Sequence, residues 1–311
     1  MLFRSVVSGD GQINRWIGEF IDGKWNYKKF AAEKEAKSFT SPGTLPSCIA
    51  QSDKGIFVGT KNDGLLLYNP ETELAKKVDG YNEKEFGKEI NDLLFDKEGN
   101  LWIGAKDGLI KYDGQSFTLF NKKNSGYTAK TVNVLYYAND MLWVGSKDGI
   151  FSFDGTNWNA YTKKEGVKQE NIVSLTGYGN KVFAAGSGFL GSTKTLVMIE
   201  NGQVTSEEAP KNFRDLVIDS DNCLWLGSDL MYKKENETIQ VYSEEVPFSL
   251  KPIIRMVYYC NNEFLFHITR NPSINVKSKS TSNSPQADFV KEYANRINTF
   301  DKDIIYIMKT K

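Results

Sequence analysis

The chain has 311 residues, a length that one large all-β domain or two smaller domains would reach. Lys plus Arg and Asp plus Glu both number 39. This balance disfavours nucleic acid or an anionic membrane as a partner, since both recruit proteins with excess positive charge. No stretch approaches the roughly 18 apolar residues of a membrane-spanning helix. The three cysteines, Cys48, Cys223 and Cys260, form no CxxC pair and are expected to be thiols, neither disulfides nor zinc ligands.

A short motif recurs along the chain. It reads "GNLWIGAKDGLIKYDG" at residues 99–114 and "DMLWVGSKDGIFSFDG" at residues 140–155. The glycine after its apolar core, which we call the anchor glycine, recurs at Gly59, Gly104, Gly145, Gly186 and Gly227. The spacings are 45, 41, 41 and 41, and further steps of 40 reach His267 and Ile307. A fixed period of this length predicts a repeat architecture.

Within one repeat the pattern predicts four short strands, named A to D. In the best-preserved repeat they span residues 90–95, 101–105, 109–113 and 116–120, separated by turns rich in Gly, Asp and Asn. Such an antiparallel meander has two apolar faces, so it is stable only when stacked against copies of itself. Radial stacking gives a β-propeller, in which a four-stranded blade takes about 40 to 50 residues.

The two ends of the chain are expected to complete the last blade. Outer strands are predicted within residues 2–30, and a strand at 304–308 is expected to begin a further unit that it does not finish. A blade shared by both termini would leave no free sheet edge there. We therefore expect a single domain over residues 1–311 with seven blades, or eight if the termini do not share one. Residues 269–289, rich in Ser, Asn, Lys and Pro, are expected to form a mobile insertion.

These residues resemble the propeller repeats of two-component regulators, whose consensus is roughly "GnLWiGT.dGLyryd..f..y". The match is closest at residues 90–120 and 132–161. The resemblance implies a sensor-type β-propeller that binds a ligand or a protein without enzymatic activity, in a periplasmic or secreted setting. The start of the chain lacks the apolar core of a signal peptide, which favours the cytoplasm or a trimmed N-terminus. Because strand sequence begins at Leu2, we expect the N-terminus to be lost or misassigned.

Trp102, Trp143 and Trp225 stand at one repeat position, and Phe57 and Leu265 take their place in other repeats. A large flat side chain there is predicted to fill the wedge between neighbouring sheets; the alternative is a platform for a ligand. The "KDG" after the anchor glycine suits a tight turn. These residues build the blade and leave its function open.

Function is therefore expected where equivalent positions differ, at the start of strand A and in the turn between strands B and C. These two regions share one face of a propeller. The position at the start of strand A is polar in six repeats: Ser47, Asn91, Asn133, Ser174, Arg214 and Arg255. These side chains could merely face water or cap turns. Alternatively they form a ligand-binding ring, in which Arg214 and Arg255 grip a carboxylate or sulfate. The partner would then be a glycan, a small acidic ligand or a protein.

The sequence gives little support for catalysis. His267, the only histidine, replaces an anchor glycine, so no catalytic triad, metal site or cofactor is expected. The acidic stretches 96–100 and 219–222 are interpreted as turns and not as calcium loops, because the full ligand spacing is missing. The enzymatic alternative is a carbohydrate-active lyase or hydrolase that uses carboxylates such as Asp92 and Asp215 on the same face.

Overall fold

The computed structural model describes residues 46–241, apart from 122, 170, 187–193, 220, 229–230 and 236–237. Outside that range it describes only the backbone of seven strands: residues 7–8, 16–21, 24–29, 31–32, 253–260, 263–269 and 304–309. The chain divides into two compact units, residues 1–175 and 176–311, and the division falls within strand β17.

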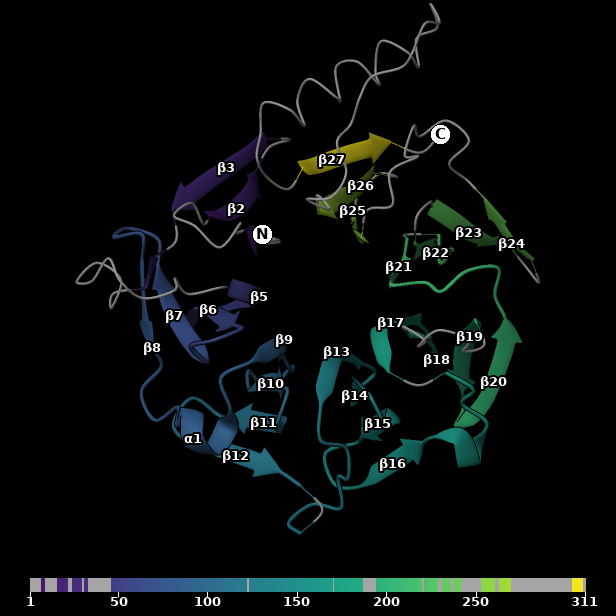
Figure 1. The fold of residues 1–311 in the computed structure, drawn as a ribbon, viewed down its shortest axis with the longest axis horizontal. Coiled ribbons are helices and arrows are strands. Elements are labelled where there is room, and N and C mark those ends of the chain that lie inside the picture. Colours follow the sequence, from purple (N-terminus) through teal and green to yellow (C-terminus); the bar gives the residue numbers. More distant parts are fainter. Residues whose placement is uncertain are drawn as a thin grey trace, which may run out of the picture. The chain divides into compact units, whose positions relative to one another are not determined.

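The first unit consists of antiparallel sheets joined in chain order (Figure 1). A three-stranded sheet contains β1 (Val7–Ser8), β2 (Trp16–Ile21) and β3 (Lys24–Lys29). A five-stranded sheet has the order β4 (Ala31–Ala32), β8 (Leu74–Lys77), β7 (Leu65–Asn69), β6 (Gly55–Thr60) and β5 (Pro46–Ser52), with β4 parallel to β8. Two four-stranded meanders follow. They are β9 (Ile90–Phe95), β10 (Leu101–Ala105), β11 (Gly108–Tyr112), β12 (Phe117–Phe120), and β13 (Val132–Ala138), β14 (Met141–Ser146), β15 (Gly149–Phe153), β16 (Trp158–Tyr161).

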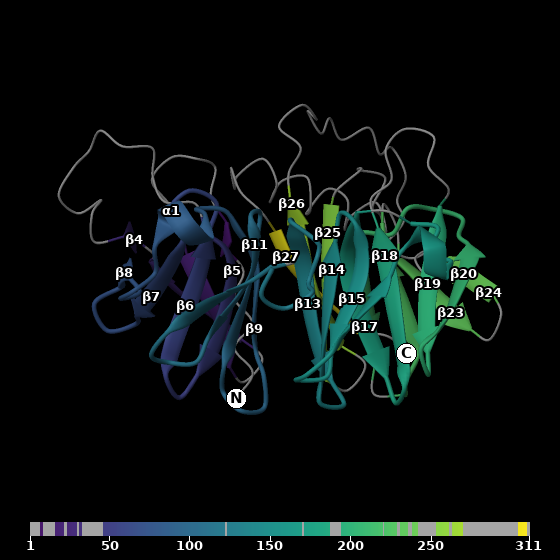
Figure 2. The same ribbon diagram turned by 90° about the horizontal axis from the view of Figure 1, so that it is seen from below.

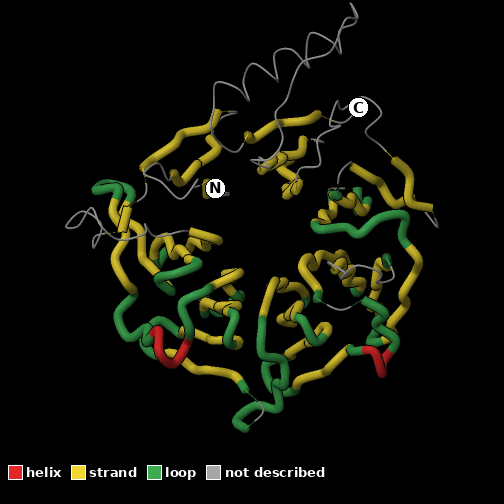
Figure 3. Tube along the Cα trace, viewed as in Figure 1, coloured by secondary structure: helices red, strands yellow, loops and turns green. Residues whose placement is uncertain are grey.

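The next sheet contains β17 (Ile172–Tyr178), β18 (Lys181–Gly186), β19 (Thr195–Glu200) and β20 (Gln203–Glu208). The second unit continues with β21 (Asp215–Ile218), β22 (Leu224–Gly227), β23 (Met231–Glu235) and β24 (Thr238–Val241), and with β25 (Ile253–Cys260), β26 (Glu263–Thr269) and β27 (Ile304–Lys309). Two short helical turns, α1 (Glu83–Phe86) and the 3-10 turn η2 (Lys163–Glu165), lie between strands (Figure 3). No helix in the described part of the chain has the length and apolar character of a membrane span.

The all-β class and the four-stranded antiparallel blades are confirmed. In the best-preserved repeat each predicted strand lies within one residue of an observed one, from β9 to β12. Strands of one blade, such as β13, β14 and β15, run alongside one another (Figure 2). The turns have the expected chemistry: Asp113 Oδ1 accepts hydrogen bonds from the backbone N–H of Gln115 and Ser116, at 2.7 and 2.8 Å.

The core lies between sheets, as stacked meanders require. Trp102, 2% exposed, packs in a cluster with Leu142, Val144 and Phe151 of the following sheet. Phe57 takes the equivalent place one sheet earlier, where its ring lies 5.8 Å from that of Phe95. Trp143 and Trp225 are also buried, so the predicted core role of this position is confirmed.

The described strands form seven sheets, and the number of blades stays a prediction. The pairing at the chain's end differs from the prediction. Strand β27 pairs with β26 as the third strand of that sheet, while β1 to β3 form a sheet of their own. Residues 304–309 therefore complete an existing unit and do not begin another. Steps of 40 residues assigned Ile307 to a new unit. The long stretch between β26 and β27 places the third strand of this sheet later in the sequence than the repeat predicts. That stretch, with nearly all of the predicted insertion at 269–289, lies outside the described residues.

Candidate ligand-binding face

Three of the six predicted site residues lie at equivalent places in the first unit. In β5, β9 and β13 the pairing with the next strand shifts by one residue near the strand start, which makes a bulge. The residue skipped by the pairing is Ser47, Asn91 or Asn133. A residue in a bulge is released from the ladder and its side chain can be aimed elsewhere.

Each of these side chains donates a hydrogen bond to a backbone carbonyl of the following sheet. The donor and acceptor atoms are Ser47 Oγ and Ile90 O at 2.6 Å, Asn91 Nδ2 and Val132 O at 2.7 Å, and Asn133 Nδ2 and Ile172 O at 2.8 Å. We call these the bridging hydrogen bonds. They join neighbouring blades, so the main role of these donors is to hold adjacent sheets together.

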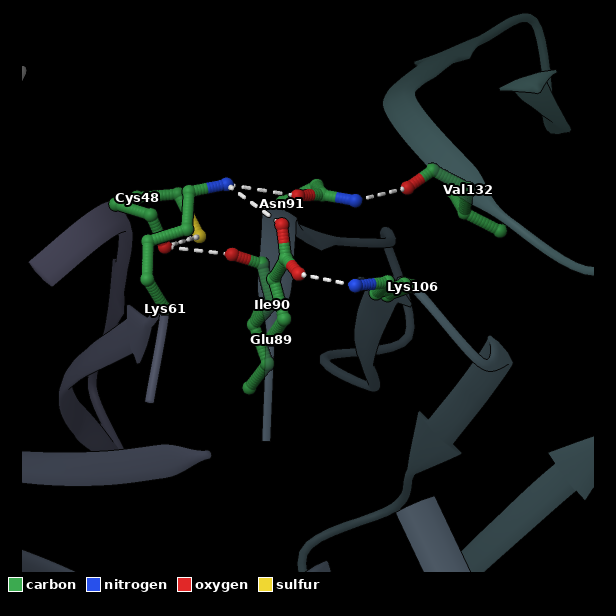
Figure 4. A network of polar contacts seen from close by, with 8 residues as sticks. Cys48, Lys61, Glu89, Ile90, Asn91, Lys106 and Val132 are labelled. Atoms are coloured by element: carbon green, nitrogen blue, oxygen red, sulfur yellow. Dashed lines mark hydrogen bonds and ion pairs between the residues drawn. The ribbon is translucent and has the colours of Figure 1, made fainter. Parts of the chain in front are cut away.

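The side-chain oxygen of Asn91 takes part in an exposed polar network (Figure 4). Lys61 Nζ donates to Asn91 Oδ1 at 2.8 Å and lies 3.7 Å from Glu89 Oε1. The second oxygen of Glu89 lies 3.2 Å from Lys106 Nζ. Lys61 and Lys106 are 44% and 61% exposed. One carboxylate is thus shared by two solvent-facing ammonium groups.

The lysines of this network belong to a repeated set that sequence reasoning missed. Lys61, Lys106 and Lys147 each stand two residues after an anchor glycine, in the turn between strands B and C, and all three are exposed. They lie beside the strand starts: Lys106 N donates to Glu89 O, and Asn171 N donates to Lys147 O. The signal was visible in "TKND", "AKDG" and "SKDG". We call this surface, with Ser47, Asn91 and Asn133, the strand-start face.

Asp92, one of the carboxylates of the enzymatic alternative, is held by backbone donors. Its Oδ1 accepts from Leu93 N at 2.9 Å and its Oδ2 from Leu135 N of the following sheet at 2.8 Å. Asp215 Oδ1 likewise accepts from Leu216 N at 3.1 Å. Both oxygens of Asp92 therefore bind main-chain amides, as in a structural bridge.

The acidic turns are confirmed as turns. Asp96 Oδ1 accepts from Asn100 N at 2.8 Å and its Oδ2 from Trp102 Nε1 at 2.9 Å. Asp219 makes the matching bond to Trp225 Nε1 at 2.7 Å. The described residues contain no group of three or more His, Cys, Asp or Glu side chains able to hold a metal. Cys48 and Cys223 form no disulfide.

The structure places Ser174 one residue beyond the bridging position. Asn133 bonds to Ile172 O as Asn91 bonds to Val132 O, so Val173 stands at the strand start and Ser174 is buried, 4% exposed. The error came from the anchor. Phe183 fills the tryptophan position against the next sheet, which makes Ala185 the equivalent of the anchor glycines.

The two arginines are not equivalent to each other. Arg255 pairs with His267 in the β25–β26 register, as Asp215 pairs with Gly227, so it lies one position past the strand start. Its side chain is outside the described residues. Arg214 immediately precedes β21, is exposed, and donates its backbone N–H to Gly227 O at 2.9 Å. Convergence of these arginines with the other ring residues stays a prediction.

Comparisons with known proteins place these features in context. The family model described as SMP-30/Gluconolactonase/LRE-like region matches residues 21–164. No curated protein matches the chain. Among solved structures, the extracellular domains of two proteins named as hybrid two-component systems of B. thetaiotaomicron are 20% and 17% identical, with TM-scores of 0.60 and 0.59. These alignments cover 84% and 82% of this chain and 37% of each of those chains. Virginiamycin B lyase from Staphylococcus aureus is 15% identical, with a TM-score of 0.56, over 76% of this chain and 84% of that one.

The fold is a β-propeller. In fold the chain is similar to the extracellular domains of these hybrid two-component systems, in line with the resemblance of its repeats. It spans a little over a third of the length of those extracellular domains. At these identities the likeness concerns the fold, so the ligand must be argued from the chain's own residues.

Proposed function

We propose that this propeller is a non-enzymatic recognition module whose strand-start face binds an anionic ligand, such as an acidic glycan fragment. The observation that carries the proposal is the recurrence of an exposed lysine in three consecutive blades, at Lys61, Lys106 and Lys147. Ammonium groups repeated along one face suit a ligand with repeated carboxylates or sulfates. The similarity to extracellular sensor domains supports a receptor role.

The charge pattern favours an anion over a neutral ligand. Glu89 lies between Lys61 and Lys106 and offsets part of their charge. The residue at its position in the following repeat is Thr131, so Lys147 lacks the acidic neighbour that Lys106 has there, although Asp107 and Asp148 follow the two lysines in their turns. The side-chain donors of the bulge residues already bond the next blade, which leaves the lysines as the cationic groups that a ligand would meet.

The test is calorimetric titration of wild type and the Lys106→Gln/Lys147→Gln variant with uronic-acid and sulfated oligosaccharides. We expect the variant to bind at least about tenfold more weakly, corresponding to roughly 1.4 kcal/mol. Binding to wild type should also weaken as salt is raised, because the lysines are solvent-exposed. Lys97→Gln is the matched control: Lys97 is 53% exposed and lies at the opposite end of the same blade, in the turn between β9 and β10. Equal affinity of the double variant and wild type would overturn the proposal.

A second candidate is an enzyme acting on sugar acids or lactones, because the family model over residues 21–164 is named in part for gluconolactonase. The backbone bonds to both oxygens of Asp92 argue against that residue as the catalytic group. Purified wild type should be assayed with aldonolactones and with uronic-acid oligosaccharides. Turnover that a folded Asp92→Asn variant loses would replace the binding proposal with the enzymatic one.

A further inference from the structure

The second unit contains a cleft of about 700 Å³ between the sheets β17–β20 and β21–β24. Its lining residues are Tyr178, Lys181, Phe183, Met198, Thr205, Glu207, Asn222, Cys223, Leu224 and Lys234. This volume lies in the range of small-molecule sites, about 300 to 1,000 Å³. None of these residues belongs to the strand-start face, so a ligand site in this cleft is independent of the proposed function.

The cleft has a cause in the repeat. Phe183 occupies the position that Trp102 and Trp225 hold in other blades, and a phenyl ring fills less of the wedge between sheets than an indole. The same replacement at Phe57 accompanies a smaller cleft, about 440 Å³, in the first unit. Both clefts thus lie beside a phenylalanine at the tryptophan position.

The floor of the larger cleft is apolar. Phe183 and Leu224 are 4% and 3% exposed, and Met198 packs against the same cluster. The ring of Tyr178 stacks on Phe183 with centroids 6.0 Å apart and an interplanar angle of 29°. Aromatic and thioether side chains together favour a flat apolar ligand.

One wall of the cleft carries a largely buried cation. Lys234 Nζ bonds to Glu207 Oε1 at 2.7 Å and to Oε2 at 2.9 Å, and the lysine side chain is 15% exposed. An ammonium has three donors, and the bonds found among the described residues use two of them. The lining holds the ammonium groups of Lys181 and Lys234 and the carboxylate of Glu207, and Lys181 Nζ lies 3.8 Å from Glu200 Oε1 outside the lining.

We propose that this cleft is a second ligand site, which takes a small aromatic carboxylate. The aromatic body lies on Phe183 and Met198, and the carboxylate accepts the third hydrogen of the Lys234 ammonium. Glu207 keeps that ammonium in place through two bonds, so the site needs little rearrangement on binding.

The first test uses 2-naphthoate as the probe, titrated calorimetrically into wild type and Phe183→Trp. Restoring the indole should fill the cleft and lower the affinity at least tenfold. Phe57→Trp is the matched control, because it makes the same change at the other cleft, and it should leave the affinity unchanged. Circular dichroism melts verify that both variants are folded. Equal affinity of Phe183→Trp and wild type, or loss only in Phe57→Trp, would overturn the assignment.

The second test separates charge from shape and does not depend on the folding of Phe183→Trp. The Glu207→Gln/Lys234→Met variant removes both charges without leaving either partner alone. It should bind 2-naphthoate at least tenfold more weakly than wild type while binding neutral 2-naphthylmethanol with unchanged affinity. A parallel loss for both probes, or for neither, contradicts a carboxylate held by Lys234.

Discussion

The hydrogen bond between Trp102 and Asp96 allows a sharp test of how the blades are stabilised. Trp102 Nε1 donates to Asp96 Oδ2 at 2.9 Å, and the indole is 2% exposed. Phenylalanine at this position keeps an aromatic ring in the wedge but cannot donate. A hydrogen bond to a charged group contributes about 1.5 to 3 kcal/mol. We therefore expect Trp102→Phe to lower the free energy of unfolding by about 2 to 4 kcal/mol, since some packed volume is also lost.

A double-mutant cycle with Asp96→Ala isolates the bond. Asp96 also accepts from Asn100, so its removal alone weakens the turn as well. The coupling energy between the two substitutions should be about 1 to 2 kcal/mol, within the usual range for residues in contact. Urea unfolding followed by circular dichroism measures all four proteins and avoids the fluorescence change that loss of a tryptophan brings.

Trp143→Phe is the control for lost volume. Trp143 stacks on Tyr161, at 5.7 Å between centroids, and Ala138 stands two residues after its strand partner, where Asp96 stands relative to Trp102. Its replacement should therefore cost less than Trp102→Phe. A coupling energy near zero, or equal losses for the two tryptophans, would refute the reasoning that the carboxylate fixes the indole.

Three further predictions concern turns and contacts between sheets. Hydrogen bonds from the backbone of Ser116 and Gln115 hold the pKa of Asp113 below its ordinary value. The ionised carboxylate therefore stabilises this turn at pH values above the ordinary pKa, and the stabilisation is lost as the pH falls through the lowered pKa. An NMR titration should show the low pKa, with a partial return upward in Ser116→Ala; an unshifted titration would count against it. Asn133→Ala removes a bridging hydrogen bond and should cost about 1 to 3 kcal/mol in urea unfolding. Gly104→Ala should cost about 1 to 3 kcal/mol by the same measurement, because the added Cβ would lie 2.6 Å from a valine methyl group of the next sheet; a stabilised variant would show that the sheets can separate without penalty.

Features encoded by local periodicity were predictable. The strands of the best-preserved repeat, the burial of Trp102 and the turn role of Asp96 all follow from alternation and turn chemistry within one blade. The period itself accounts for six of the described sheets, those with anchor positions from Gly59 to His267.

Features that depend on contacts between two blades could not be predicted from the sequence. The donors of Asn91 and Asn133 bond carbonyls about 40 positions further on, which no local pattern reveals. Ser174 was misplaced because "FAAG" offers two small residues where one anchor is expected, and only the burial of Phe183 decides between them. The clefts depend on how well side chains fill the space between two sheets. A phenylalanine in the sequence does not by itself predict that volume.

Strand β4 covers the outer edge of β8. It follows the sheet of β1 to β3 and pairs in parallel with β8, the last strand of the next meander, through Ala31 with Leu74 and Ala32 with Ala75. An outermost strand with unsatisfied amides and carbonyls is a template for pairing with another chain. Proteolysis or truncation just before residue 33 would therefore do more than remove the first sheet. It would leave β8 as an unpaired edge strand, so we expect the shortened protein to self-associate.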